Sequence, residues 1–224
     1  MELFIEYLEY WKDKYPSILE YMTEHVVISF TVIIIAVSFS VPLAIYMTKM
    51  KSERIKNLIF NIANVFQTIP TIALLAIMIP ILGIGFKPAV VALLLYSLLP
   101  LLRNTYAGME SVSPEIIEAA KGMGFNTFQR LFKIELPVAL PYVMSGIRVT
   151  SVYIISWTTL AALIGAGGLG DLVLAGIGYN DQFMIMTGTI LAITIAICLD
   201  LILGLIEKKI IEKVLKINFK KEEF

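Results

Sequence analysis

The chain has 224 residues, of which 58% are hydrophobic and only 16% are charged, whereas soluble globular proteins average about 25% charged residues. The mean hydropathy of +0.83 therefore indicates a membrane protein. Eighteen basic and eighteen acidic residues cancel, so no overall field favours nucleic acid as a partner.

The first 24 residues form an acidic segment. Six acids stand there against two lysines, the reverse of the basic leading region of a secretory signal, so we expect no cleaved leader. Apolar residues from Phe4 to Met22 recur at helical spacing. The segment is predicted to be an amphipathic helix, either lying in the membrane interface or packed as a short cap on the bundle.

Five apolar segments follow, at approximately 26–47, 58–82, 88–102, 138–164 and 183–206. At about 1.5 Å per residue, most are long enough to cross a hydrocarbon core of about 30 Å. The third is short, and we expect it to extend through Arg103 to Tyr106. The second contains Pro70 and Pro80, so it is expected to be a kinked helix that faces the bundle. The sequence predicts an all-α polytopic membrane protein with five transmembrane helices.

Basic residues concentrate on one side of these segments. Loop 48–57, loop 103–137 and the tail from residue 207 hold fourteen of the eighteen, whereas the opposite side holds three. By the positive-inside bias, the N-terminus faces outward, and the 103–137 loop and the C-terminus are cytoplasmic. We therefore expect segment 1–24, one transmembrane domain over 25–206, and a basic cytoplasmic tail over 207–224.

The 103–137 loop is predicted to hold a helical hairpin. A helix start is expected at Ser113, where a hydroxyl is followed by a proline and an acid. This helix should run over 114–123 and end at Gly124, because glycine adopts the left-handed conformation without penalty. An apolar face over 125–132 predicts a second short helix, which the Leu-Pro pair at 136–137 is expected to end.

Seven positions of this loop follow the pattern E-A-A, three residues, G, nine residues, I-x-L-P. They are Glu118, Ala119, Ala120, Gly124, Ile134, Leu136 and Pro137. The pattern resembles the coupling loop of the permease subunits of binding-protein-dependent ABC importers. The resemblance implies that the loop docks into a cleft of a cytoplasmic ATPase, with Glu118 making a polar contact. The small residues of the first helix suit close insertion into such a groove.

Further runs resemble the permeases of glycine betaine, carnitine and choline importers. They are Gln67–Pro70, Ile79–Gly85, Tyr96–Gly108 and Gly165–Asp171. The last run is shared with methionine-type permeases, whereas the Arg-Asn-Thr-Tyr stretch at 103–106 is more specific to the osmoprotectant branch. The resemblance implies a second permease subunit, identical or homologous, a separate ATPase and an extracellular binding protein, all at the cytoplasmic membrane.

A path for a quaternary ammonium or zwitterionic solute needs aromatic faces and uncharged polar groups. The candidates are Tyr96, Tyr153, Trp157 and Thr158; alternatively, these residues belong to the core or the interfacial belt. The glycine-rich stretch 165–178 is either an outer gate or seat for the binding protein, or a re-entrant turn that packs two segments closely.

Arg148 and Asp200 are charges inside apolar segments, where a charge costs at least ~2.5 kcal/mol. Arg148 lies about 15 Å from the start of the fourth segment, and Asp200 about 10 Å from the same face of the membrane. We expect the two to pair, within the chain or across a permease dimer, in a structural or a gating role.

The sequence predicts a transport subunit and not an enzyme. Its single histidine, His25, and single cysteine, Cys198, are expected to be an interfacial and a small core residue. Without hydrolase, metalloprotease or P-loop patterns, we expect no catalytic residue, metal or cofactor. The expected cargo is glycine betaine, choline or carnitine. A methionine-type or other small-solute importer is the nearest alternative, and an ion-coupled secondary transporter a more distant one.

Overall fold

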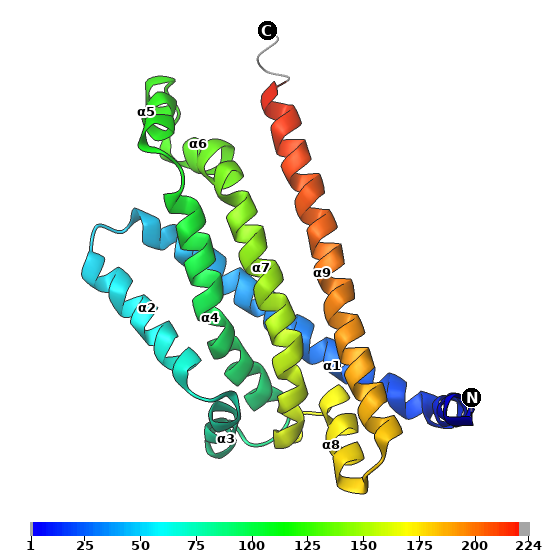
Figure 1. Ribbon diagram of the computed structural model, residues 1–224. Coiled ribbons are helices and arrows are strands. Elements are labelled where there is room, and N and C mark those ends of the chain that lie inside the picture. The colour runs from blue at the N-terminus through cyan, green and yellow to red at the C-terminus, as the bar shows by residue number, and fades with distance from the viewer. Residues whose placement is uncertain (1, 220–224) are drawn as a thin grey trace.

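The computed structural model describes residues 2–219, and within that range the chain forms helices without any β-strand (Figure 1). The elements are α1 (Glu2–Lys49), α2 (Glu53–Thr68), α3 (Thr71–Leu82), α4 (Phe86–Glu110), α5 (Pro114–Gly122), α6 (Thr127–Arg130), the π-helix η1 (Leu131–Glu135), α7 (Leu136–Thr158), the 3₁₀-helix η2 (Thr159–Ile164), α8 (Leu169–Tyr179) and α9 (Gln182–Phe219). Four helices are long and apolar enough to cross a membrane, and the bent pair α2 and α3 makes a fifth crossing if it counts as one span. The predicted all-α fold of a polytopic membrane protein is confirmed.

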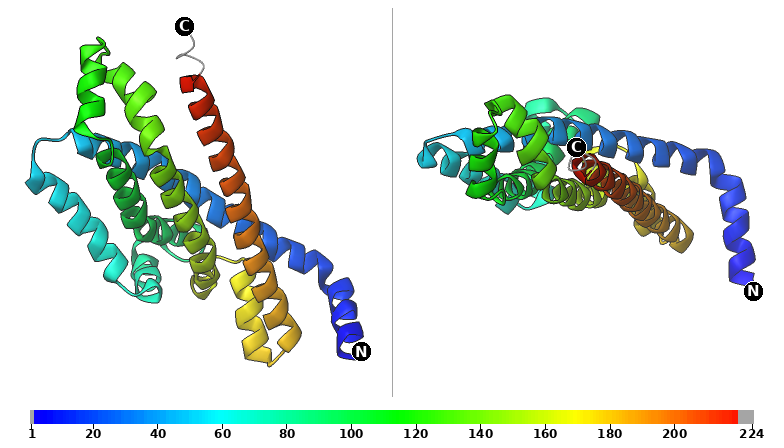
Figure 2. Two further views of the ribbon diagram at one scale, coloured as in Figure 1. Left: turned by 45° about the horizontal axis from the view of Figure 1, so that its top comes forward. Right: turned by 90° about the horizontal axis from the view of Figure 1, so that it is seen from above.

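The acidic N-terminal segment and the first apolar segment form one helix, α1. Pro16 lies inside this helix, and Figure 2 shows the N-terminal turns bent away from the rest of it, as a missing backbone donor allows. The Tyr7 hydroxyl lies 3.0 Å from that of Thr187, and the Tyr7 and Tyr10 rings contact Phe183 with centroids 5.6 and 5.9 Å apart. The N-terminal turns therefore pack against the beginning of α9.

The second apolar segment is broken more sharply than a kinked helix would be. Its two halves, α2 and α3, meet at an angle of 99°. Ile69 and Pro70 between them are extended, with ψ of 131° and 134°. The ring of Pro70 disfavours the helical region for Ile69, the residue before it. The predicted kink is thus a break between two helices.

Helix α4 occupies the centre of the bundle, packed against both α1 and α7. It continues past Arg103 to Glu110, as expected for the short third segment. A Cβ added at Gly108 would lie 2.6 Å from the Cβ of Tyr142, and one added at Gly146 would lie 2.6 Å from the Cβ of Asn104. One glycine on each helix therefore lets α4 and α7 cross at close range.

The two ends of the bundle carry different elements. Figure 1 shows α5 and α6 at one end, and α3 and the α8–α9 turn at the other. His25 is fully buried in α1, and Cys198 is exposed on α9. The expectation of a core cysteine was therefore wrong, because helix orientation, which decides burial, depends on tertiary packing. The interfacial position of His25 stays a prediction.

Candidate functional site

The first helix of the hairpin begins and ends where local chemistry predicts. Pro114 is its first residue, and Gly124 follows its end with a left-handed φ of 79°. The Gly124 N–H donates to the Lys121 carbonyl at 2.9 Å, and the Phe125 N–H donates to the Ala120 carbonyl at 3.1 Å. These two bonds form a Schellman motif, which satisfies carbonyls that a helix end otherwise leaves free.

The start of α5 differs from the expected hydroxyl cap. The Ser113 side chain makes no capping hydrogen bond to the backbone. Instead, the backbone N–H of Glu115 and then the Ser113 side chain hydrogen-bond the Glu115 carboxylate and hold its pKa below the ordinary value. The Glu115 carboxylate, and not the Ser113 hydroxyl, therefore accepts a backbone N–H at the start of this helix.

A capping box starts the second short helix, α6. The Gln129 N–H donates to the Asn126 side-chain oxygen at 2.8 Å, and the Asn126 N–H donates to that of Gln129 at 3.0 Å. Asparagine followed three residues later by glutamine is a readable signal for a helix start. Our sequence analysis missed it.

The Leu-Pro pair at the end of the loop does not break the helix. The chain runs from α6 through the π-helix η1 into α7, with Glu135 and Leu136 both helical. The Leu136 N–H reaches the Leu131 carbonyl, five residues back. Pro137 has no N–H and its ring clashes with the carbonyl four residues earlier in a regular helix, and the wider π turn relieves this conflict. The expected helix end at 136–137 was therefore wrong.

The seven pattern positions divide between surface and interior. Glu118, Ala119 and Gly124 are exposed, Ala120 is fully buried, and Ile134, Leu136 and Pro137 are partly buried. Ala120 is buried under the hairpin's own turn, where its carbonyl accepts the Phe125 N–H. Only part of the small-residue face is thus open to a partner.

Large apolar side chains are exposed around the hairpin. We call Ile116, Met123, Phe128 and Phe132 the hairpin tip; they are 41%, 67%, 71% and 53% exposed. The Phe128 and Phe132 rings contact each other, with centroids 4.5 Å apart. Clustered exposed aromatic and aliphatic groups next to polar residues are typical of a surface that binds another protein.

Glu135 forms an ion cluster that the sequence analysis missed. Its side chain is 2% exposed, and its carboxylate binds Lys49 at the end of α1 and the Arg130 Nε, the latter at 2.6 Å. Glu135 occupies the variable position of the I-x-L-P pattern. Arg130 lies only five residues away, but the burial of Glu135 and its contact with Lys49 depend on how α1 packs on this helix.

Three of the four candidate pathway residues lie together. The Tyr96 and Trp157 rings meet edge to face with centroids 4.5 Å apart, and the Tyr153 and Trp157 rings are 5.5 Å apart. We call these three rings the aromatic cluster. Thr158 is not part of it: this buried hydroxyl donates to the Ile154 carbonyl at 2.7 Å and accepts from Ser29 of α1 at 3.1 Å.

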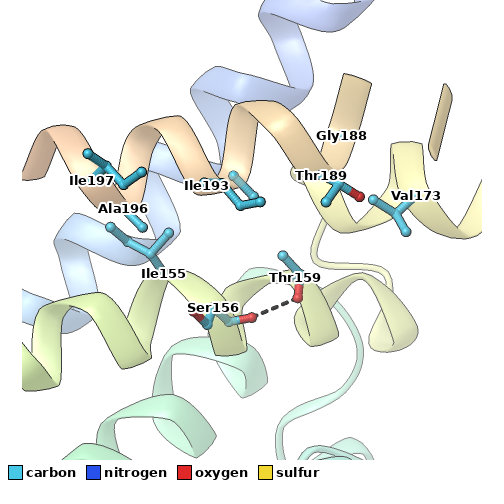
Figure 3. A pocket seen from close by; sticks show the side chains of 10 residues that line it. Ile155, Ser156, Thr159, Val173, Gly188, Thr189, Ile193, Ala196 and Ile197 are labelled. Carbon is cyan, nitrogen blue, oxygen red and sulfur yellow. Dashed lines mark hydrogen bonds between the residues drawn. The ribbon is translucent and has the colours of Figure 1, made fainter. Parts of the chain in front are cut away.

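A separate groove of about 360 Å³ lies between α7, α8 and α9 (Figure 3). Its lining is mostly aliphatic, with hydroxyls from Ser156, Thr159 and Thr189, and among the described residues no charged or aromatic side chain lines it. The Thr159 hydroxyl at its wall already donates to the Ser156 carbonyl at 2.7 Å. Such a lining suits hydrocarbon and not a cation.

Arg148 and Asp200 lie face to face within the one chain. Arg148 Nε and Nη2 donate to the two Asp200 carboxylate oxygens, both at 3.0 Å, and Nη1 donates to Glu207 at 2.8 Å. A Cβ added at Gly204 would lie 3.2 Å from the Arg148 Cζ, so glycine makes room for the guanidinium. Asp200, Gly204 and Glu207 share one face of α9. Glu207 was missed, although its spacing from Asp200 was the available signal.

The glycine-rich stretch before α8 touches α1. Gly165, Gly167 and Gly168 all have left-handed or otherwise positive φ values. The Gly168 N–H donates to the Glu24 carboxylate at 2.8 Å. We call residues 165–168 the glycine loop; it is bound to α1 through Glu24.

Comparisons with known proteins show which family this chain resembles. Residues 40–212 match the family described as "Binding-protein-dependent transport system inner membrane component". The chain is 41% identical to the choline transport system permease protein OpuBB of Bacillus subtilis (strain 168), over 84% of this chain and 85% of that protein. It is 38% identical to the glycine betaine/carnitine/choline transport system permease protein OpuCB of the same organism, over 85% and 87% of the two chains.

A solved structure shows the same fold. The inward-facing MetNI methionine ABC transporter superimposes with a TM-score of 0.77, over 86% of this chain and 95% of that chain, at 22% sequence identity. At this level of identity the likeness establishes the architecture and nothing about the solute. The chain therefore belongs to the family of inner membrane components of binding-protein-dependent transport systems.

Proposed function

We propose that the protein is the permease subunit of an ATP-driven importer that carries choline, glycine betaine or carnitine into the cytoplasm. The observation that carries this proposal is the 41% identity to a choline permease along most of both chains. Further relatives, at 38% and 37% identity, are named for glycine betaine, carnitine and choline, or for carnitine. The structural likeness to a methionine transporter, at 22% identity, does not favour methionine as the solute.

The aromatic cluster supports the proposed solute class. A quaternary ammonium group has no N–H to donate, so ring faces that attract it electrostatically are the groups best suited to meet it. Tyr96 from α4 and Tyr153 and Trp157 from α7 supply three such rings in contact. Arg148, by contrast, is already bound to two carboxylates. We infer that the solute passes along the aromatic cluster, while high affinity resides in the binding protein.

The hairpin supports a docking role for the cytoplasmic ATPase. Its tip exposes apolar side chains, and Glu118 is exposed beside them. In the proposed cycle, two permease subunits each present one hairpin to one ATPase subunit. Closure of the ATPases on ATP draws the hairpins together and opens the bundle outward, and hydrolysis resets it. The hairpin and the basic tail would then face the cytoplasm.

Uptake by the reconstituted complex tests the proposal. The permease, its ATPase and its binding protein are placed in proteoliposomes, and uptake of labelled choline, glycine betaine, carnitine and methionine is measured with and without ATP. We expect ATP-dependent uptake of at least one quaternary ammonium compound and none of methionine. Uptake of methionine alone, or uptake that is independent of ATP, would overturn the proposal.

A further inference from the structure

The Glu135 carboxylate is buried, and both of its oxygens are bound. One accepts from Arg130, which lies in the hairpin, and the other from Lys49, the last residue of α1. Two cations around one buried carboxylate offset its cost of desolvation, and removing either leaves charge poorly compensated. The cluster therefore has a strong preference for the position in which all three groups meet.

This cluster is an ionic contact between the hairpin and α1. Helix α5 packs on α6, and α6 on η1. Within residues 2–219, none of these three elements makes an extensive backbone contact with α1. A displacement of the hairpin can therefore reach α1 through Glu135 and Lys49, beside the apolar cluster on which Ile45 of α1 and Leu131 of η1 both pack.

The same helix is held at a second point by the glycine loop. The Glu24 carboxylate accepts the Gly168 N–H at 2.8 Å. From Glu24 to Lys49 the helix rises about 37 Å, at about 1.5 Å per residue. Helix α1 therefore connects the hairpin end of the bundle with the end that carries the glycine loop, and Figure 1 shows it crossing behind the other helices between these ends.

Between the two points α1 is a single helix that packs on the core on both sides of Pro42. Ile28 and Val32 lie in a core cluster with Leu93 and Ile154. Nearer the hairpin, Ala44 and Met47 lie in another cluster, formed with α2 and α4. The helix is continuous from one cluster to the other. Close-packed helices of this kind transmit displacements because they have few alternative arrangements.

We propose that α1 transmits movement between the cytoplasmic hairpin and the glycine loop, with Glu135 and Glu24 as the positioning residues at its two joints. The inference rests on the proposed role of the hairpin as the ATPase contact. Because coupling between two sites is reciprocal, an event at the glycine loop, such as arrival of the loaded binding protein, then alters the ATPase through the same helix.

The test measures how strongly the loaded binding protein stimulates ATP hydrolysis by the complete complex in nanodiscs. We expect Glu135→Gln and Glu24→Gln each to reduce this stimulation roughly tenfold, which is within the usual range of allosteric coupling. Glu20→Gln is the matched control, because Glu20 is exposed one turn before Glu24, and it should retain the stimulation. Stimulation at the wild-type level in both Glu135→Gln and Glu24→Gln would overturn the proposal.

A pair of glycine variants tests the outer joint without changing any charge. Gly165 and Gly167 have φ values of 71° and 84°, so alanine is strained at both. A Cβ at Gly167 would overlap the Glu24 carboxylate, whereas a Cβ at Gly165 meets nothing within 4 Å. We expect Gly167→Ala to lose the stimulation and Gly165→Ala to keep it. Equal loss in the two variants would mean that backbone strain, and not the Glu24 contact, is responsible.

Combined variants separate a shared path from two unrelated defects. If both residues act on one path, the double variant Glu135→Gln with Glu24→Gln should reduce the stimulation no further than either single change. If the two defects are independent, their fold-reductions should multiply. Where Glu135→Gln prevents assembly, Lys49→Gln replaces it, since this change removes the α1 partner of the same contact. Multiplying losses, with assembly intact, contradict the proposal. The readout uses whichever solute the binding protein carries, so a wrong solute class would not affect it.

Discussion

The two ends of the molecule are held together by different forces. At the hairpin end, Glu135 gathers Lys49 and Arg130 around one buried carboxylate. At the other end, α8 and α9 are held by close contact, since a Cβ added at Gly176 would lie 2.8 Å from the Ile185 side chain and backbone, and one at Gly188 2.7 Å from Val173. A buried ion cluster depends on the pairing of its charges, and a close-packed contact depends on shape. Loss of a charge should therefore disturb the hairpin end, and added volume should disturb the α8–α9 end.

The largest effect should come from the hairpin itself. In Gly124→Val, a β-branched residue must adopt a left-handed φ, which costs at least about 1–2 kcal/mol and disturbs the Schellman turn. We expect ATP-driven uptake to fall to background while the protein still inserts in the membrane, and Glu118→Lys should do the same. Gly122→Ala is the matched control, because a Cβ there also meets nothing within 4 Å but the residue is helical. Normal uptake by Gly124→Val and Glu118→Lys would count against a rigid docking hairpin.

At the close-packed end, added volume should lower stability. In Gly188→Ala, the new methyl group would lie 2.7 Å from the Val173 side chain and 3.0 Å from the Leu169 carbonyl. Overpacking of this kind costs about 1–3 kcal/mol, so thermal unfolding in detergent should occur at a lower temperature. Gly178→Ala, on α8 with open space around it, should unfold like the wild type. Equal melting temperatures for both variants would show that volume does not control this end.

The Arg148 contacts should give a smaller effect. Arg148→Ala leaves Asp200 and Glu207 without their partner inside an apolar helix, so we expect a loss of thermal stability. Exchanging the residues, with Arg148→Asp and Asp200→Arg, should recover most of it in a thermal unfolding assay. Glu207→Gln should cost less than Arg148→Ala, since both bonds to Asp200 remain. An exchange no more stable than the single changes would refute the pairing.

The smallest effect concerns Asp171 in α8, outside the long apolar spans. Burial and then the charge of Glu24 raise the pKa of Asp171 above its ordinary value of 3.8. A raised pKa means that folding favours the protonated form, so the melting temperature should fall as pH rises through that pKa. Asp171→Asn should remove this part of the pH dependence and be slightly more stable at neutral pH. A wild type and a variant with parallel pH profiles would exclude the effect.

The parts that sequence predicted correctly are governed by local rules. Pro114 and Gly124 bound the first hairpin helix because their backbone preferences act within one turn. Arg148 and Asp200 came together because depth along two apolar helices follows from residue counting. The aromatic cluster combines Tyr96 from one segment with Trp157 from another. The sequence named these rings as candidates without predicting that they touch, and their role in a solute path stays a prediction.

The parts that could not be predicted depend on how separate helices meet. Glu135 has no signal in its own neighbourhood, because its burial and its Lys49 partner come from the end of a distant helix. Pro137 was expected to end a helix. The π turn that accommodates this proline depends on the packing around it, which the local sequence does not show. The 99° angle at Pro70 and the complete burial of His25 likewise follow from packing.

The π turn at Leu131–Glu135 also fixes a direction in space. A helix advances about 100° around its axis per residue, so an inserted residue that is absorbed as a wide turn rotates everything before it. The number of residues between Gly124 and Pro137 then sets the orientation of the hairpin tip about the axis of α7. Deleting a single residue from this turn would rotate Phe128 and Phe132 by about a quarter of a revolution.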